Sequence, residues 1–240
     1  PAKRRELSAQ PAGAAVQVSH TCANGKGITM TFVDPGVPRK ANHFFNTAAK
    51  KAVAAVIAGD AAAGCERPYT YDEVARWMLT SEKLSKNRIG DYLGRTDEHA
   101  MATIDAFLGH LDFTPFVFDE ALRFFLSLFK LPGEAQKIDR IIEAFAKFFY
   151  ETNSEEWDHP DTCYMIAFSL TMLNTDAHND NIRKDRKMTL DDIAAGIHGN
   201  RDQVLDEIEA IVSAGTKVSL DHILDESLDE ECLEELFEFF

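Results

Sequence analysis

The stretch FKLPGEAQKIDR, residues 129–140, places a Pro-Gly turn between two strongly apolar segments. Pro132 presets φ for the second position of a turn, and Gly133 tolerates the positive φ that a type II turn demands next. We therefore predict a type II turn that ends one helix and starts another. Glu134 lies at the exit of this turn, and we expect its carboxylate to point away from the chain. On the residues alone, a glutamate that offsets the dipole of a starting helix is the more ordinary interpretation, and a functional carboxylate is the alternative.

Apolar residues recur at helical spacing through most of the chain on either side of this turn. The expected helices cover residues 42–58, 71–79, 86–93, 97–108, 116–129, 135–150, 160–173, 189–197, 204–212 and 224–237. No convincing strand is visible between residues 41 and 240, so roughly ten helices joined by short turns predict an all-α fold. The 17 phenylalanines fall mostly between Phe107 and Phe149, where we expect the core to centre.

Capping residues mark several of the expected helix ends. Thr70 and Thr96 are each expected to cap a helix, since a threonine hydroxyl accepts a hydrogen bond from a free backbone N–H. Gly59 is expected to close the first helix. The segment from Tyr164 to Leu173 is apolar nearly all round, which predicts a buried central helix.

Residues 1–40 are expected to form a linker or tail that is mostly irregular. Within them, residues 28–33 alternate β-branched and apolar side chains and could form one short strand, for which the sequence offers no partner. The segment 219–240 is acidic and amphipathic. A solvated acidic helix is the ordinary interpretation of this segment, and docking of its apolar residues on the domain is the alternative.

The net charge of the chain is −15, which argues against a nucleic-acid partner, because such a partner needs a basic face. The four cysteines are widely separated and suggest neither a disulfide framework nor a metal site, so we expect a reducing, cytoplasmic environment. The longest apolar run is about half of the ~20 residues that a membrane span needs. Pro1 stands in place of Met, so we expect flanking domains that this sequence does not include.

A second polar cluster follows the apolar segment, and calcium binding is the metal hypothesis to test there. Asp176, His178 and Asp180 fall at positions one, three and five of a calcium loop. Asn181 stands at position six in place of Gly, and Lys187 at position twelve in place of the bidentate Glu. We therefore expect no metal. Neither a Gly-x-Ser-x-Gly elbow nor a glycine-rich phosphate loop is present, so we expect no cofactor either.

The sequences LPGEAQKIDR and EAFA, within residues 131–146, resemble the first signature of the Sec7 domain. The sequence MLNTDAHN, residues 172–179, resembles the second signature, and the spacing between the two suits the family. The segment IGDYLG, residues 89–94, is similar to an earlier part of the family pattern. The resemblance runs from about residue 41 to residue 218, which we expect to be the Sec7-like domain.

This resemblance implies a superhelix of about ten α-helices and a role as a guanine-nucleotide exchange factor for Arf-family small GTPases. Such a protein catalyses exchange without covalent chemistry. Glu134 matches the family's glutamic finger, which enters the GTPase nucleotide site, faces the β-phosphate and pairs with the phosphate-loop lysine. An Arf-type GTPase, GDP-bound or nucleotide-free, is therefore the expected partner of a monomeric chain that regulates Arf signalling and vesicle trafficking.

The resemblance also implies an apolar groove that grips the GTPase switch regions. Tyr164, Phe168 and Met172 match groove positions, and their four-residue spacing places them on one helix face. Without the resemblance, plain core packing of these three is the favoured interpretation. Three polar positions around the groove match as well: Lys130, Asp139 and Asn179.

Departures from the family pattern keep other functions open. Thr171, Ala177 and Asp180 stand where the family usually has an apolar residue, leucine and proline. A helical scaffold that binds a GTPase or another protein without exchanging nucleotide is the alternative function, and a metal-dependent enzyme is a distant third. The expected location is peripheral to Golgi or endosomal membranes, with recruitment through partners or flanking domains.

Overall fold

The computed structural model describes residues 13–21, 27–153, 159–178, 183 and 186–187, and this part of the chain is mostly helical. Its elements are β1 (Ala15–Thr21), β2 (Gly27–Val33), α1 (Arg39–Ala58), the 3-10 helix η1 (Ala61–Ala63), α2 (Tyr71–Thr80), α3 (Lys86–Leu93), α4 (Glu98–Gly109), α5 (Phe118–Ser127), α6 (Ala135–Thr152) and α7 (Pro160–His178). Seven α-helices lie within the described residues, each close to an expected helix. The three helices expected after residue 188, including the acidic one in 219–240, lie outside the described residues.

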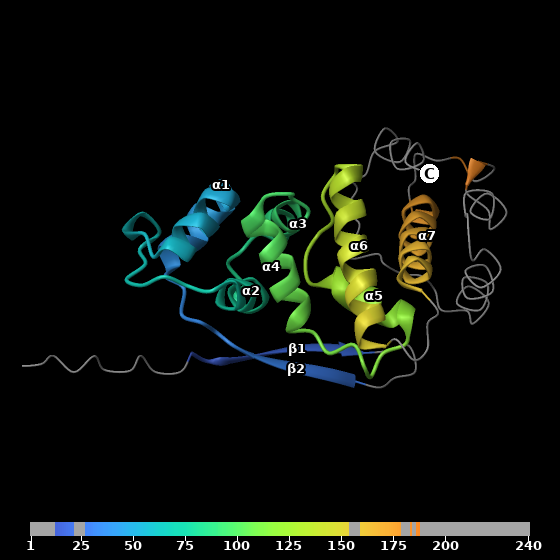
Figure 1. The fold of residues 1–240 in the computed structure, drawn as a ribbon, viewed down its shortest axis with the longest axis horizontal. Helices are drawn as coiled ribbons and strands as arrows, with labels where there is room; N and C mark the ends of the chain where they lie inside the picture. The colour runs from blue at the N-terminus through green and yellow to red at the C-terminus, as the bar shows by residue number, and fades with distance from the viewer. Residues whose placement is uncertain (1–12, 22–26, 154–158, 179–182, 184–185, 188–240) are drawn as a thin grey trace, which may run out of the picture.

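The helices follow one another along the long axis of the molecule (Figure 1). Helix α1 lies at one end, α2, α3 and α4 occupy the middle, and α5, α6 and α7 form the other end. The closest helix pairs are α2 with α4 and α6 with α7. The hairpin of β1 and β2 runs along one side of this row of helices.

The N-terminal hairpin corrects two expectations. Residues 28–33 do form a strand, β2, but it pairs antiparallel with β1 in a register from Ala15 opposite Val33 to Thr21 opposite Gly27. Residues 15–21 and 27–33 are therefore not an irregular tail, and the described part of the fold is mostly helical with a small sheet rather than all-α. The hairpin is held because one of its faces is apolar: Phe32 is buried, and Val18, Ile28 and Met30 pack against the core. An edge of the Phe32 ring meets His110 with ring centroids 6.4 Å apart.

Helix capping follows the sequence in most places. The Thr70 Oγ1 accepts a hydrogen bond from the Glu73 N–H at 3.2 Å, and Glu73 Oε2 accepts one from the Thr70 N–H at 3.0 Å. This reciprocal capping box satisfies two backbone donors at once. Gly59 ends α1 in the left-handed conformation with φ of 72°. The cap expected at Thr96 is wrong, because α4 begins at Glu98 and Asp97 is its flanking residue.

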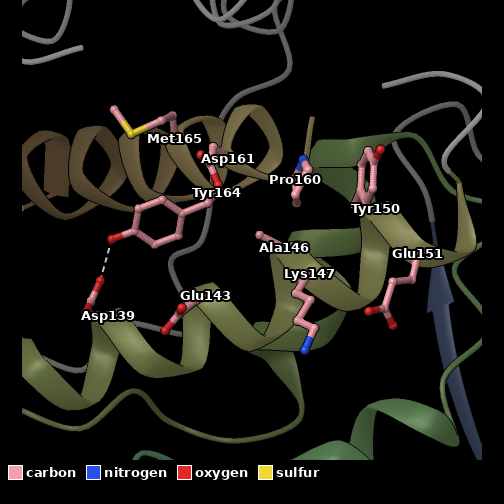
Figure 2. A pocket seen from close by; sticks show the side chains of 10 residues that line it. All are labelled: Asp139, Glu143, Ala146, Lys147, Tyr150, Glu151, Pro160, Asp161, Tyr164 and Met165. Carbon is pink, nitrogen blue, oxygen red and sulfur yellow. Dashed lines mark hydrogen bonds between the residues drawn. The ribbon is translucent and has the colours of Figure 1, made fainter. Parts of the chain in front are cut away.

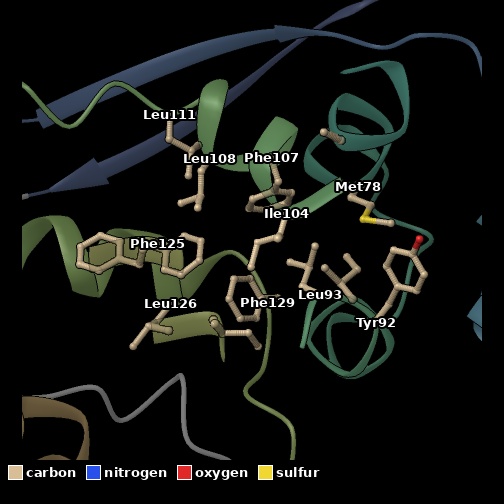
Figure 3. Packing of buried hydrophobic residues seen from close by; sticks show 14 of the residues in the cluster. Met78, Tyr92, Leu93, Ile104, Phe107, Leu108, Leu111, Phe125, Leu126 and Phe129 are labelled. Carbon is tan, nitrogen blue, oxygen red and sulfur yellow. The ribbon is translucent and has the colours of Figure 1, made fainter. Parts of the chain in front are cut away.

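Aromatic side chains from α4, α5 and α6 form the centre of the core. Figure 3 shows the part of it that contains Phe107, Phe125 and Phe129. Phe125 stacks on Phe145 with ring centroids 5.3 Å apart, and it meets Phe129 edge-on at 5.1 Å. Phe107 contacts Phe129 edge-on at 6.2 Å. These offset and edge-on geometries are the ones that aromatic rings prefer. The core therefore centres between Phe107 and Phe149, as expected, and it fixes α5 and α6 on either side of the connection that holds Glu134.

Candidate functional site

The connection between α5 and α6 presents Glu134 to solvent. Glu134 is the residue just before α6, with an extended backbone (φ −107°, ψ 119°), and its side chain is 68% exposed. The expected type II turn is wrong: among the described glycines only Gly36, Gly59 and Gly64 have positive φ, and the chain simply bends at Gly133. The extended backbone of Glu134 leads directly into α6, so the left-handed glycine that a type II turn requires is not needed.

Helix α3 braces this connection from behind. The Lys130 N–H donates to the Lys86 carbonyl at 3.2 Å, and Lys86 Nζ donates to the Ser127 carbonyl at 2.8 Å. A Cβ on Gly90 would lie 1.8 Å from the Lys130 carbonyl oxygen, so the backbone approaches α3 more closely than any other residue would permit. The loop that carries Glu134 is thus anchored at its start by backbone and side-chain contacts to α3.

An ion-pair network lies beneath Glu134. Lys137 Nζ contacts Glu134 Oε1 at 2.7 Å and Asp91 Oδ1 at 2.5 Å. Burial alone would lower the pKa of Lys137, but the hydrogen bonds to Asp91 and Glu134 raise that pKa above its ordinary value. Neither Lys137 nor Asp91 was predicted from the sequence as part of this site. Lys137 was detectable as an i,i+3 partner of Glu134, whereas Asp91, 46 residues before Lys137, was not.

A cavity of about 740 Å³ lies between α6 and α7 (Figure 2). It is lined by Asp139, Glu143, Ala146, Lys147, Tyr150, Glu151, Pro160, Asp161, Tyr164 and Met165. The Tyr164 hydroxyl reaches from α7 to α6 and donates a hydrogen bond to Asp139. Burial, together with this hydrogen bond, raises the pKa of Tyr164 far above its ordinary value. Two of the expected contact residues, Asp139 and Tyr164, are therefore brought together at one edge of the cavity.

The other expected groove residues are placed differently. Phe168 is 5% exposed and Met172 is 4% exposed, and both belong to the core cluster. This burial matches the core-packing alternative, and a groove contact by either residue stays a prediction. Thr171 is also buried, and its hydroxyl donates to the Ala167 carbonyl of its own helix at 2.8 Å. The buried Thr171 hydroxyl therefore has a hydrogen-bond partner within α7.

Two further site expectations are only partly covered by the structure. Lys130 is half-buried on the connection between α5 and α6. Asn179 lies outside the described residues, as do six of the twelve residues of the rejected calcium loop, 179–182, 184 and 185. Across the described part of the chain, no cluster of three or more His, Cys, Asp or Glu side chains could hold a metal. None of the described helices is long and apolar enough to cross a membrane.

Comparison with known proteins decides the family. The sequence model of the Sec7 domain matches residues 37–209. The chain belongs to the Sec7 domain family. The chain is 45% identical over 147 residues to the ankyrin repeat, PH and SEC7 domain containing protein secG of Dictyostelium discoideum. This match covers 60% of this chain and 14% of that protein. The chain is 40% identical over 149 residues to the brefeldin A-inhibited guanine nucleotide-exchange protein 2 of Arabidopsis thaliana, covering 61% of this chain and 8% of that protein.

Solved structures agree with this assignment. One neighbour is a structure of ARF1-GDP bound to a Sec7 domain complexed with brefeldin A, with a TM-score of 0.56 and 30% identity. The match covers 71% of this chain and 87% of that chain. By contrast, the chain spans only 14% and 8% of the two curated relatives, so those relatives contain much more than a Sec7 domain.

Proposed function

We propose that this Sec7 domain is a guanine-nucleotide exchange factor that releases GDP from an Arf-type small GTPase. Glu134 acts as the finger that enters the nucleotide site. The observation that carries the proposal is the placement of Glu134: an exposed carboxylate on a loop that α3 and the aromatic core hold on both sides. Two comparisons support the choice of partner and activity. One relative is named as a nucleotide-exchange protein, and one solved neighbour is a Sec7 domain bound to ARF1-GDP.

The proposed mechanism is competition between anions. A GTPase holds GDP because Mg²⁺ and a lysine neutralise its phosphates. The Glu134 carboxylate takes the lysine as its own partner and repels the β-phosphate. Two unit charges about 4 Å apart interact by roughly 4 kcal/mol at an effective dielectric near 20. Because each 1.4 kcal/mol is about tenfold in an equilibrium constant, one well-placed carboxylate weakens nucleotide binding by roughly three orders of magnitude.

While Glu134 enters the nucleotide site, another surface of the chain must hold the GTPase. We assign this role to the side of α6 and α7 that bears Asp139 and Tyr164, with Lys130 and Asn179 as further polar contacts. Phe168 and Met172 contribute from beneath, where they set the position of α7. The chain catalyses exchange without forming a covalent bond, and its action as a monomer at Golgi or endosomal membranes remains a prediction.

The direct test is release of a fluorescent GDP analogue from a panel of small GTPases. The wild-type chain is expected to accelerate release from an Arf-type member, and Glu134→Ala is expected to abolish most of the acceleration without weakening complex formation. Formation of a stable complex with no accelerated release would overturn the proposal and favour the scaffold that binds without exchange. Equal release rates with wild type and Glu134→Ala would show that the finger assignment is wrong.

A further inference from the structure

Lys137 links the helix that braces the loop to the carboxylate that the loop presents. Its side chain is only 12% exposed, although it is a lysine in the first turn of a surface helix. One ammonium group donates to Asp91 of α3 and to Glu134 at the start of α6. The contact joins the Lys137 ammonium to Oε1 of Glu134 at 2.7 Å.

The backbone around Lys137 is placed as tightly as its side chain. A Cβ on Gly94 would lie 2.6 Å from the Lys137 Cβ and 2.9 Å from the Lys137 carbonyl oxygen. Arg140 Nε donates to the Gly94 carbonyl at 2.8 Å from the next turn of α6. The end of α3 therefore lies against the first two turns of α6 at a distance that only glycine permits, and Lys137 has little room to move.

We propose that Lys137 and Asp91 are positioning residues that hold the Glu134 carboxylate in place as the GTPase docks, before it turns to the GTPase lysine. The proposal rests on the exchange activity proposed above. Its physical basis is conformational entropy. An ion pair between two mobile side chains contributes little, because both must be ordered. Lys137 is already ordered by burial and by Asp91, so only Glu134 loses freedom when the pair forms.

Asp91 has a second role in the same arrangement. When Glu134 turns toward the lysine of a GTPase, it leaves Lys137 as a largely buried cation. A buried charge without a partner is strongly unfavourable. Asp91 remains at 2.5 Å and keeps Lys137 paired, so the glutamate can exchange one cation for another without leaving an unpaired charge behind. Lys137 thus orients the finger without trapping it.

Lys137→Met tests the proposal, because it keeps the unbranched apolar stem of the side chain and removes its charged end. We expect kcat for GDP release to fall about fivefold with little change in the KM for the GTPase, since docking persists while the carboxylate samples unproductive rotamers. Lys137→Arg should retain most of the rate, because a guanidinium can donate to both carboxylates. Lys50→Met is the control: it removes the charge of an exposed lysine on α1 that pairs with Asp97 at 3.9 Å, and it should leave kcat unchanged.

A double variant separates positioning from a general structural role. In a Glu134→Ala background, Lys137→Met should cause no further loss of kcat, because no carboxylate remains to be placed. A further fall in the double variant would overturn the proposal, as would an unchanged or higher kcat in Lys137→Met alone.

A measurement that does not depend on exchange keeps this inference distinct from the proposed function. The pKa of the Lys137 ammonium, followed by NMR, is expected to fall in both Glu134→Gln and Asp91→Asn, since each removes an anionic partner that raises it. An unchanged Lys137 pKa in Glu134→Gln would overturn the contact itself. Absence of GDP release by the wild type would instead overturn the proposed function and the positioning role together, even if the NMR titration showed the contact.

Discussion

Helix α6 takes part in two regions that are built on different principles. Its first turns meet α3 through ion pairs and close backbone contact, and they leave Glu134 68% exposed. Its later turns face α7, where Tyr164 and Asp139 edge a cavity and the neighbouring Phe168 is 5% exposed. In the first region, a change to the exposed Glu134 should alter exchange with little effect on stability, because its carboxylate contributes little to the core. In the second, the residues expected to grip a partner also hold the fold together, so a change there alters stability and binding at once.

Phe168→Ala should have the largest effect on stability. A small effect would contradict the view that the α7 side of α6 holds the fold together. Truncation of a buried phenylalanine typically costs about 3–5 kcal/mol, through lost apolar burial and the cavity left behind. We expect a loss in this range in the free energy of unfolding, measured by urea denaturation. The half-buried Met165 on the same helix is the control, and Met165→Ala should cost clearly less. A Phe168→Ala variant with unchanged stability would contradict the core role of this residue.

Gly90→Ala should have an intermediate effect and acts on the region around Glu134. The new Cβ would lie 1.8 Å from the Lys130 carbonyl oxygen, so the connection to α6 must shift. We expect a loss of about 1–3 kcal/mol in the free energy of unfolding, together with slower GDP release. Gly109→Ala is the matched control, since nothing lies within 4 Å of its added Cβ, and it should be neutral or slightly stabilising. Equal effects at the two glycines would show that α3 does not brace the loop.

Tyr164→Phe should have the smallest effect on stability. It measures how much the hydrogen bond between α7 and α6 contributes. It removes the hydroxyl that donates to Asp139, at an expected cost of about 1 kcal/mol at neutral pH. The pKa of Tyr164 is raised in the folded protein, first by burial and then by Asp139, so folding favours the neutral phenol. Its contribution to stability is therefore complete below the ordinary tyrosine pKa of about 10 and is lost as pH rises above that value. Urea denaturation between pH 8 and 11 should show a steeper decline for wild type than for Tyr164→Phe, and parallel declines would contradict this assignment.

Local patterns in the sequence predicted the seven described helices, most of their caps and the exposed placement of Glu134. These features depend on residues a few positions apart, such as Thr70 with Glu73, and a single sequence shows them. The hairpin was only half predicted: in its partner strand Val16 and Val18 alternate with Gln17 and Ser19, and this short alternation was not taken as a strand. The contact of Asp91 with Lys137 could not be predicted, since it requires α3 and α6 to meet at Gly94. The face of α7 that bears Phe168 was ambiguous for another reason: a helix that is apolar nearly all round does not indicate which side is buried.

Charge reversal at Glu134 tests the central claim most directly. Glu134→Lys should reduce the acceleration of GDP release from an Arf-type GTPase below that of Glu134→Ala, because a cation attracts the phosphates that the carboxylate repels. Glu98→Lys is the matched control: Glu98 is likewise an exposed glutamate at the start of a helix, α4, and its reversal makes the same change in net charge. We expect a loss of roughly three orders of magnitude at Glu134 and wild-type exchange at Glu98. Comparable rates for wild type and Glu134→Lys would contradict the account.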